Sequence, residues 1–279
     1  MGAQAPEDVK TARIRSSAFN YLEKASESFG KGLIVLVIAV IIAVAGAAVS
    51  AAVIGYAASQ AWQAVQSTVQ SMEESGFIPS SSQLQQVYQQ QMQQAYEVVG
   101  FVTLLLLVSV SYAVKYVGKG ARLAWRGFSW LEGINAAPYS VEIRLGVIAF
   151  IIGSALVGVL LIISLWTSIT IANLLASGNV NSALEFYKTT VSSVHWFAVT
   201  SWVVLALGGV ITGYAFLRCA GICGVGQTKG GAVTSIIGFL IILFSIFLTS
   251  VTLAVVLRVI GLIVALVGFY KAAGGFFLV

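Results

Sequence analysis

Long runs of apolar residues, broken by few charges, dominate the pattern of the chain. They cover residues 33–58, 98–114, 145–176, 196–217 and 232–270. A single helix over the 39 residues of the last run would be about 58 Å long, nearly twice the roughly 30 Å hydrocarbon core of a bilayer. That run must therefore fold back, and the hydroxyl-bearing residues 249–252 are the expected turn. The pattern predicts an all-α, polytopic integral membrane protein with about six transmembrane helices.

The composition agrees with a membrane protein and excludes two other classes. Of the 279 residues, 58% are hydrophobic and only 9% are charged, and the mean hydropathy is +0.94. A soluble domain carries about 25% charged residues, so a water-exposed globular surface is excluded. Intrinsic disorder is excluded as well, because it requires low hydrophobicity.

The distribution of basic residues predicts the orientation of the spans. The chain has 15 Lys and Arg residues. With six spans, 13 of them fall on the side of the two termini, and only Lys188 and Arg258 fall on the other side. Because connections rich in Lys and Arg stay in the cytoplasm, we expect a multi-pass protein of the cell membrane with both termini cytoplasmic.

Residues 1–30 form a cytoplasmic amphipathic segment in front of the membrane domain of residues 31–279. The first apolar run begins too late and is too long for the core of a cleaved signal peptide. The pattern of residues 9–29 predicts a helix that lies on the inner membrane surface. The apolar stripe of this helix consists of Ile14, Ala18, Leu22, Ala25 and Phe29. The alternative is a plain cytoplasmic stub.

Between the first two spans, residues 60–97 are expected to form an outer helical hairpin. Two stripes at helical spacing flank a turn signal and can face each other as an antiparallel pair. They are Trp62, Val65, Val69 and Met72 before the turn, and Leu84, Val87, Tyr88, Gln91 and Ala95 after it. The alternative is a disordered tract, because residues 83–94 contain eight glutamines.

The turn of this hairpin carries two large apolar residues, Phe77 and Ile78. Apolar side chains exposed at a loop tip favour docking on a protein partner or on the outer bilayer surface. The alternative is a tip that packs on its own stem.

Residues 115–144 form the most basic connection between spans. Arg122 and Arg126 lie four apart, on one face of a predicted helix that also carries Trp125 and Trp130. Tryptophans together with cations are typical of the lipid headgroup level, so we expect both arginines to contact headgroups. The alternative is positive charge that sets the topology and binds no ligand.

Arg258 is expected a short way inside the last span, where a lone charge is costly. Because no span contains an acidic residue, we expect its guanidinium to reach the outer headgroups, or Glu185 or Glu97. The alternative is a functional gate.

Small residues recur every four positions along the first span and reappear in the fourth. They are Ala43, Ala47, Ala51, Gly55 and Ser59 in the first span, and Gly209 and Gly213 in the fourth. Small residues at this spacing let helix backbones approach closely. They serve either packing within the chain or an interface with other membrane proteins or with a second copy of this chain.

The basic connection also resembles part of a known family. Arg-Gly-Phe at residues 126–128 is followed by Leu131 and then by Gly146, which opens a glycine-rich span. This arrangement is similar to that of archaeal multi-pass membrane proteins of unknown function. The resemblance covers residues 115–275, implies glycine-spaced spans and an archaeal source, and carries no activity with it. The outer hairpin departs from that family's pattern.

Residues that could support chemistry are sparse. His195, the only histidine, is expected at the outer interface beside Trp196. Cys219 and Cys223 are too few for a structural zinc site. They are packing residues, a metal site completed by a partner, or a disulfide in a thermophile. The glycine-rich residues 221–231 lack a Walker A lysine and are expected to form a flexible turn.

These observations predict a non-catalytic structural or accessory protein, a subunit of a larger assembly that contacts membrane lipids and other membrane proteins. We expect no enzymatic activity, no cofactor, no metal and no nucleic-acid partner, and the lack of acidic residues in the spans disfavours ion coupling. The alternative is a transporter or channel for an uncharged solute or lipid. Its expected lining is Thr167, Ser168, Thr170 and Asn173.

Overall fold

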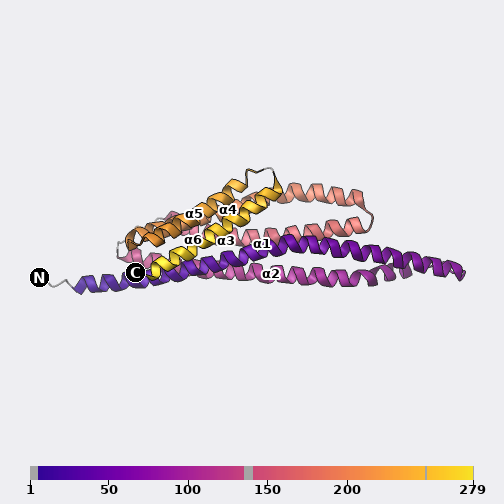
Figure 1. The fold of residues 1–279 in the computed structure, drawn as a ribbon, viewed down its shortest axis with the longest axis horizontal. Coiled ribbons are helices and arrows are strands. Elements are labelled where there is room, and N and C mark those ends of the chain that lie inside the picture. Colours follow the sequence, from indigo (N-terminus) through magenta and orange to yellow (C-terminus); the bar gives the residue numbers. More distant parts are fainter. Residues whose placement is uncertain (1–5, 135–140, 249, 279) are drawn as a thin grey trace. The chain divides into compact units, whose positions relative to one another are not determined.

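The computed structural model describes residues 6–134, 141–248 and 250–278, and six helices make up these ranges apart from short turns. Figure 1 shows them in chain order: α1 (Pro6–Glu74), α2 (Ser81–Gly133), α3 (Val141–Ala176), α4 (Val180–Cys223), α5 (Gly226–Ser245) and α6 (Val251–Phe277). All six are long and apolar enough to cross a membrane. The predicted all-α fold with six membrane-spanning helices is confirmed.

The predicted fold-back within the last apolar run is present. α5 ends at Ser245 and α6 begins at Val251. The Ser250 hydroxyl accepts a hydrogen bond from the Leu253 backbone N–H at 3.4 Å, which satisfies one of the donors left free at the start of a helix. Thr249, the first residue of the expected turn, lies outside the described residues.

The chain divides into two compact units, and each contains parts of several helices. The six-helix unit consists of Met1–Ile38, Ser109–Val159 and Phe197–Val279, and it includes the whole of α5 and α6. The four-helix unit consists of Ala39–Val108 and Leu160–Trp196. It contains the turn that joins α1 to α2 and the turn that joins α3 to α4.

A cluster of phenylalanine rings forms the core of the six-helix unit. Phe29 of α1 lies with its ring centroid 5.3 Å from that of Phe150 and 5.4 Å from that of Phe269. The remaining members are Phe19, Phe128, Phe216, Phe239 and Phe276. All eight side chains are buried, and most pairs are tilted or edge to face, as the ring quadrupoles favour. Each of the six helices contributes at least one ring, so the cluster ties them together.

α5 and α6 meet through glycine faces that sequence analysis did not identify. A Cβ atom added at Gly238 would collide with the backbone of Ala265, and one added at Gly268 with the backbone of Ser235. The missing side chains let the two backbones touch. In a membrane, where lipid is as apolar as a helix surface, such close packing is what holds two helices together.

The glycine-rich residues 221–231 do not form the expected flexible turn. α4 continues to Cys223 and α5 begins at Gly226, so the connection is very short. Gly224 has a φ angle of +75°, a left-handed conformation that glycine adopts without steric cost. Gly231 already packs against the backbone of Ala272. These glycines therefore serve a tight turn and a helix contact.

The N-terminal segment is helical, but its apolar stripe is not free to contact lipid, as the expected position on the membrane surface requires. It continues without a break into the first span as α1. Its stripe is covered by protein within the six-helix unit: Leu22 contacts Gly127 of α2, and Phe19 stacks on Phe276 of α6. Ala18, Leu22, Ala25 and Phe29 are all fully buried. The stripe was assigned correctly, but its partner is other helices and not lipid.

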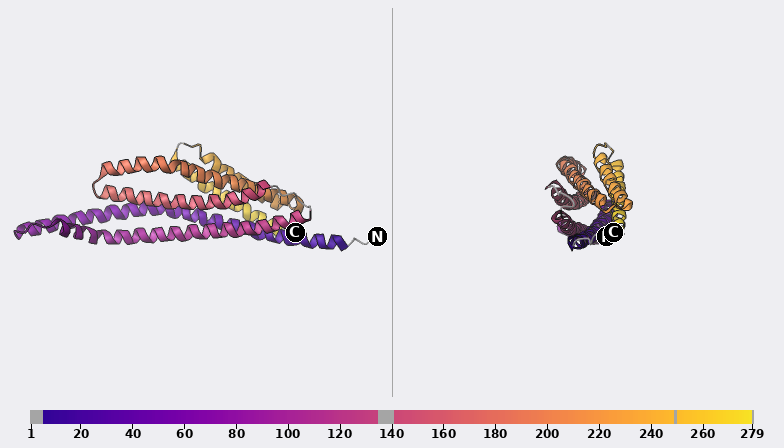
Figure 2. Two further views of the ribbon diagram at one scale, coloured as in Figure 1. Left: turned by 180° about the vertical axis from the view of Figure 1, so that it is seen from behind. Right: turned by 90° about the vertical axis from the view of Figure 1, so that its left-hand side faces the viewer.

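The hairpin of residues 60–97 is ordered and helical in the four-helix unit, which excludes the disordered alternative. Figure 1 and the left view of Figure 2 show the ends of α1 and α2 running side by side to a common tip. Trp62 and Tyr88 meet across the stem with 5.9 Å between ring centroids, and Val65 is buried. One position is corrected: Gln91 is exposed, and Met92 is buried in its place.

A reciprocal cap fixes the start of α2 beside that tip. The Ser80 backbone N–H donates to Oε1 of Gln83 at 3.0 Å, and the Gln83 backbone N–H donates to the Ser80 hydroxyl at 3.4 Å. This is the capping-box arrangement, in which two residues satisfy each other's free backbone donors. The preceding Gly76 has a φ angle of +75°. The turn is therefore defined by its own sequence.

Candidate functional site

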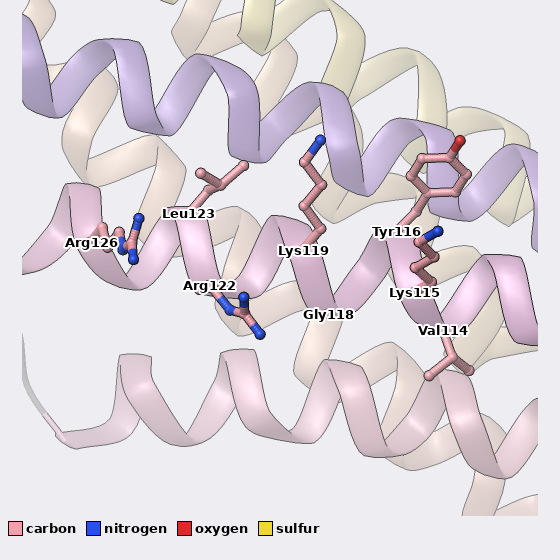
Figure 3. A pocket seen from close by; sticks show the side chains of 8 residues that line it. All are labelled: Val114, Lys115, Tyr116, Gly118, Lys119, Arg122, Leu123 and Arg126. Atoms are coloured by element: carbon pink, nitrogen blue, oxygen red, sulfur yellow. The ribbon is translucent and has the colours of Figure 1, made fainter.

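Four cationic side chains lie on one face of α2, and we call them the basic face. They are Lys115, Lys119, Arg122 and Arg126. Their spacing of four, three and four residues matches the helical repeat of 3.6. Together with Val114, Tyr116, Gly118 and Leu123 they line a groove of about 810 Å³ (Figure 3). All four cations are exposed at this groove.

The opposite face of α2 is fixed against α1, which is why the basic face points outward. A Cβ atom added at Gly120 would lie 2.8 Å from the ring of Phe29, and one added at Gly127 would lie 2.9 Å from Leu22. The Ser28 hydroxyl also donates to the Tyr116 carbonyl at 2.9 Å. Two glycines and one hydroxyl therefore determine the rotation of α2 about its axis.

A second groove lies between α2 and α3 and shares Gly118, Arg122 and Arg126 with the first. Its volume is about 380 Å³. Apart from these three residues its lining is apolar or aromatic: Ala121, Trp125, Val147, Ile148 and Ile151. In Figure 3, the Lys119 side chain extends toward α1 and the Arg122 side chain toward α3, both from the basic face. Because Arg122 and Arg126 line both grooves, they lie where the cationic groove meets the apolar one.

The basic face has no acidic partner among the described side chains. The nearby Arg144, in contrast, is bound to Glu132 at 2.6 Å, and its guanidinium lies 5.2 Å from the ring centroid of Trp125. Lys31 is likewise bound to Glu27 at 2.6 Å. On the basic face, the one cation–π contact within the described structure is that of Lys115, whose Nζ lies 5.5 Å from the Tyr112 ring centroid. The groove therefore attracts anions, and its charge is not neutralised locally.

The tip of the α1–α2 hairpin exposes the two apolar residues identified from the sequence. Phe77 is 73% exposed and Ile78 is 94% exposed. The Phe77 backbone N–H is bound to the Met72 carbonyl at 2.8 Å, so the turn itself is formed. The alternative, in which the tip packs on its own stem, is wrong.

The small-residue stripes have two different surroundings. Gly209 faces the ring of Phe239, and Gly213 faces Ser235 and Ile236, so both serve packing of α4 on α5. On α1, Ala43 is buried and Ala47 is partly buried, as packing within the chain requires. The other three, Ala51, Gly55 and Ser59, are exposed. We call these three residues the open small face.

Arg258 has partners that sequence analysis missed. Its Nε donates to the Ser245 hydroxyl at 3.2 Å, and its guanidinium carbon lies 5.1 Å from the ring centroid of Trp202. A hydroxyl and an indole contact the guanidinium, and no carboxylate pairs with it among the described residues. The expected contact with outer headgroups stays a prediction. The indole face stabilises the cation through the ring quadrupole, and the side chain is partly buried.

The remaining candidate residues are not brought together. Among the described side chains, no three His, Cys, Asp or Glu residues could hold a metal ion. His195 is exposed beside Trp196, with 5.7 Å between ring centroids. Cys219 is buried, and the side chain of Cys223 lies outside the described part of the structure.

The expected polar lining of α3 makes only local hydrogen bonds. The hydroxyls of Ser168 and Thr170 donate to carbonyls four residues earlier in their own helix, at 2.9 Å each. Oδ1 of Asn173 is buried and has no hydrogen-bond partner in the described ranges. Of the four residues of the expected lining, only Asn173 has a buried polar atom without a hydrogen-bond partner in the described ranges.

Comparison with known proteins adds no further assignment. No protein-family model matches the chain, and neither a curated protein nor a solved structure shows significant similarity to it.

Proposed function

We propose that this protein is a non-catalytic structural or accessory subunit of a larger membrane assembly, with both termini in the cytoplasm. The observation that carries the proposal is the tip of the α1–α2 hairpin, where Ile78 is 94% exposed and Phe77 is 73% exposed. Exposing two adjacent apolar side chains to water is unfavourable, and a partner that covers them removes this cost. The tip is therefore the surface that recognises another protein.

The stem below the tip supports this assignment. A docking element has to hold its contact residues in place, since a mobile loop would lose conformational entropy on binding. Here the capping box of Ser80 and Gln83 and the ring contact between Trp62 and Tyr88 hold the tip. The open small face, which precedes the hairpin on α1, offers a second, flat surface for a neighbouring helix.

Affinity purification from native membranes in mild detergent tests the proposal. The wild-type chain should bring down a stoichiometric set of membrane proteins, and F77S/I78S should lose it. The matched control is F247S/V251S, because Phe247 is 83% exposed and Val251 is 77% exposed at the α5–α6 turn. A photo-crosslinking residue at position 78 should label a component of that set. Crosslinking to lipid alone, or a wild-type chain that purifies without partners, would contradict the proposal.

A passage for an uncharged solute or lipid is the second candidate. The observation that favours it is Asn173, whose buried Oδ1 lacks a hydrogen-bond partner among the described residues. A buried carbonyl oxygen of this kind is costly unless something binds it. Liposomes that contain the purified chain should then pass small uncharged solutes, and N173A should reduce the flux. No difference from empty liposomes would remove this candidate.

A further inference from the structure

We propose that the groove between α2 and α3 binds one anionic phospholipid, with its phosphate on Arg122 and Arg126 and one acyl chain along Ile148 and Ile151. This site is independent of the docking of the hairpin tip on another protein. It adds a defined lipid stoichiometry to a membrane protein whose basic residues would otherwise only set its orientation.

The assignment of the headgroup rests on the positive charge of the two arginines and on the lack of a carboxylate paired with either of them in the described structure. Arg122 and Arg126 line both grooves, and in the described structure no carboxylate is bound to either of them. Two guanidinium groups one helical turn apart can each form paired hydrogen bonds with phosphate oxygens. Lys115 and Lys119 continue the positive face, so a headgroup with net negative charge is favoured over a zwitterionic one.

The acyl part rests on the walls of the smaller groove. Beyond the two arginines, the groove is lined by Ala121, Val147, Ile148 and Ile151. Gly118 also lines it and contributes no side chain. Ile148 is 41% exposed. An apolar slot that begins at two cations fits an amphiphile and does not fit inorganic phosphate, which would leave the slot uncovered. An acidic peptide would bring backbone donors and acceptors that these walls cannot satisfy.

Trp125 gives the site a built-in reporter. It lines the smaller groove together with the two arginines, and it is 40% exposed. Its ring is also held by the guanidinium of Arg144, at 5.2 Å from the centroid. A lipid chain in the slot would therefore contact an indole whose position is fixed.

Native mass spectrometry of the delipidated protein in non-ionic detergent tests the headgroup part. With phosphatidylglycerol we expect one tightly bound lipid per chain, and with phosphatidylcholine of the same chain length at least tenfold weaker binding. R122Q/R126Q should weaken phosphatidylglycerol binding at least tenfold. R13Q/R15Q removes the same charge from exposed positions on α1 and should leave binding unchanged. R122K/R126K keeps the charge but loses the paired geometry, and should fall between wild type and R122Q/R126Q.

Fluorescence tests the acyl part, using phosphatidylglycerol brominated in the chain. Quenching should saturate at one lipid per chain. The saturable component should vanish in W125F and persist in W166F, because Trp166 is exposed on α3 within the four-helix unit. Inorganic phosphate at millimolar concentration should not displace the lipid.

Three outcomes would overturn the proposal. Equal weakening in R13Q/R15Q and R122Q/R126Q would mean unspecific attraction to charge. Displacement by inorganic phosphate, with quenching unchanged in W125F, would mean a free-phosphate site. Equal affinity for phosphatidylcholine would mean an annular lipid without selectivity. If R122Q/R126Q does not fold, W125F and the comparison of the two lipids on wild-type protein still decide the question.

Discussion

Trp62 on α1 and Tyr88 on α2 meet edge to face, with 5.9 Å between their ring centroids. This pair belongs to the stem of the hairpin, where Val65, Met92 and Ala95 are buried. A stem with an apolar interior is destabilised by any charge placed inside it.

V65D should loosen the hairpin, because it buries a carboxylate that has no partner. The expected cost is about 1–3 kcal/mol. Amide hydrogen exchange of residues 60–97 in detergent should become faster, while exchange in α5 and α6 should not change. Q66D, at the exposed neighbouring position, is the control and should exchange like the wild type. Rapid exchange over both segments in the wild type would show that the hairpin is not packed.

G268A should destabilise the α5–α6 pair, since the added methyl group would collide with the backbone of Ser235. Overpacking of this kind costs about 1–3 kcal/mol, and thermal unfolding in detergent should occur at a lower temperature. G221A is the control, because no atom lies within 4 Å of a Cβ added there. It should leave the unfolding temperature unchanged or slightly higher. Equal unfolding temperatures for the two variants would argue against the close helix contact.

F29A should remove the central ring of the phenylalanine cluster and leave a cavity among α1, α3 and α6. Phenylalanine-to-alanine changes in buried cores cost about 3–5 kcal/mol. F101A is the comparison, because Phe101 is 61% exposed; its cost should stay within about 0.5 kcal/mol. Chemical unfolding followed by circular dichroism measures both values, and a cost below 1 kcal/mol for F29A would contradict the cluster as the core.

G55L should separate stability from assembly. A Cβ added at Gly55 meets no atom within 4 Å, so the isolated chain should unfold at the wild-type temperature. If the open small face contacts a neighbouring helix, the native complex should become smaller in blue-native electrophoresis. G209L should do the reverse and lower the stability of the chain itself, because Gly209 faces the Phe239 ring. An unchanged complex in G55L would restrict the interface to the hairpin tip.

Helical periodicity was sufficient to predict the spans, the hairpin and most of its stripes, because these depend on neighbours three or four residues away. The same periodicity could not show what covers a stripe. Ala18, Leu22, Ala25 and Phe29 form an apolar face whether lipid or helices lie against it, and the structure places helices there. Gln91 and Met92 are adjacent on a helix, so a stripe drawn through one passes close to the other.

Contacts between distant residues were beyond prediction from one sequence. Ser245 and Trp202 reach Arg258 only because α4, α5 and α6 converge. The glycines of α5 and α6 have a visible spacing of seven residues, at Gly231 and Gly238 and at Gly261 and Gly268. That spacing was a signal for two flat faces that sequence analysis did not use, and the pairing of these faces required the fold. Of the basic face, Arg122 and Arg126 were recognised, whereas the apolar groove beside it depends on α3 lying next to α2.

The link between Arg258 and Ser245 has a consequence for biogenesis. A lone arginine entering the bilayer on an isolated helix costs about 2.5 kcal/mol or more. In this chain α4 and α5, which supply Trp202 and Ser245, are synthesised before α6. We therefore expect α6 to integrate more efficiently behind α4 and α5 than when it is expressed alone.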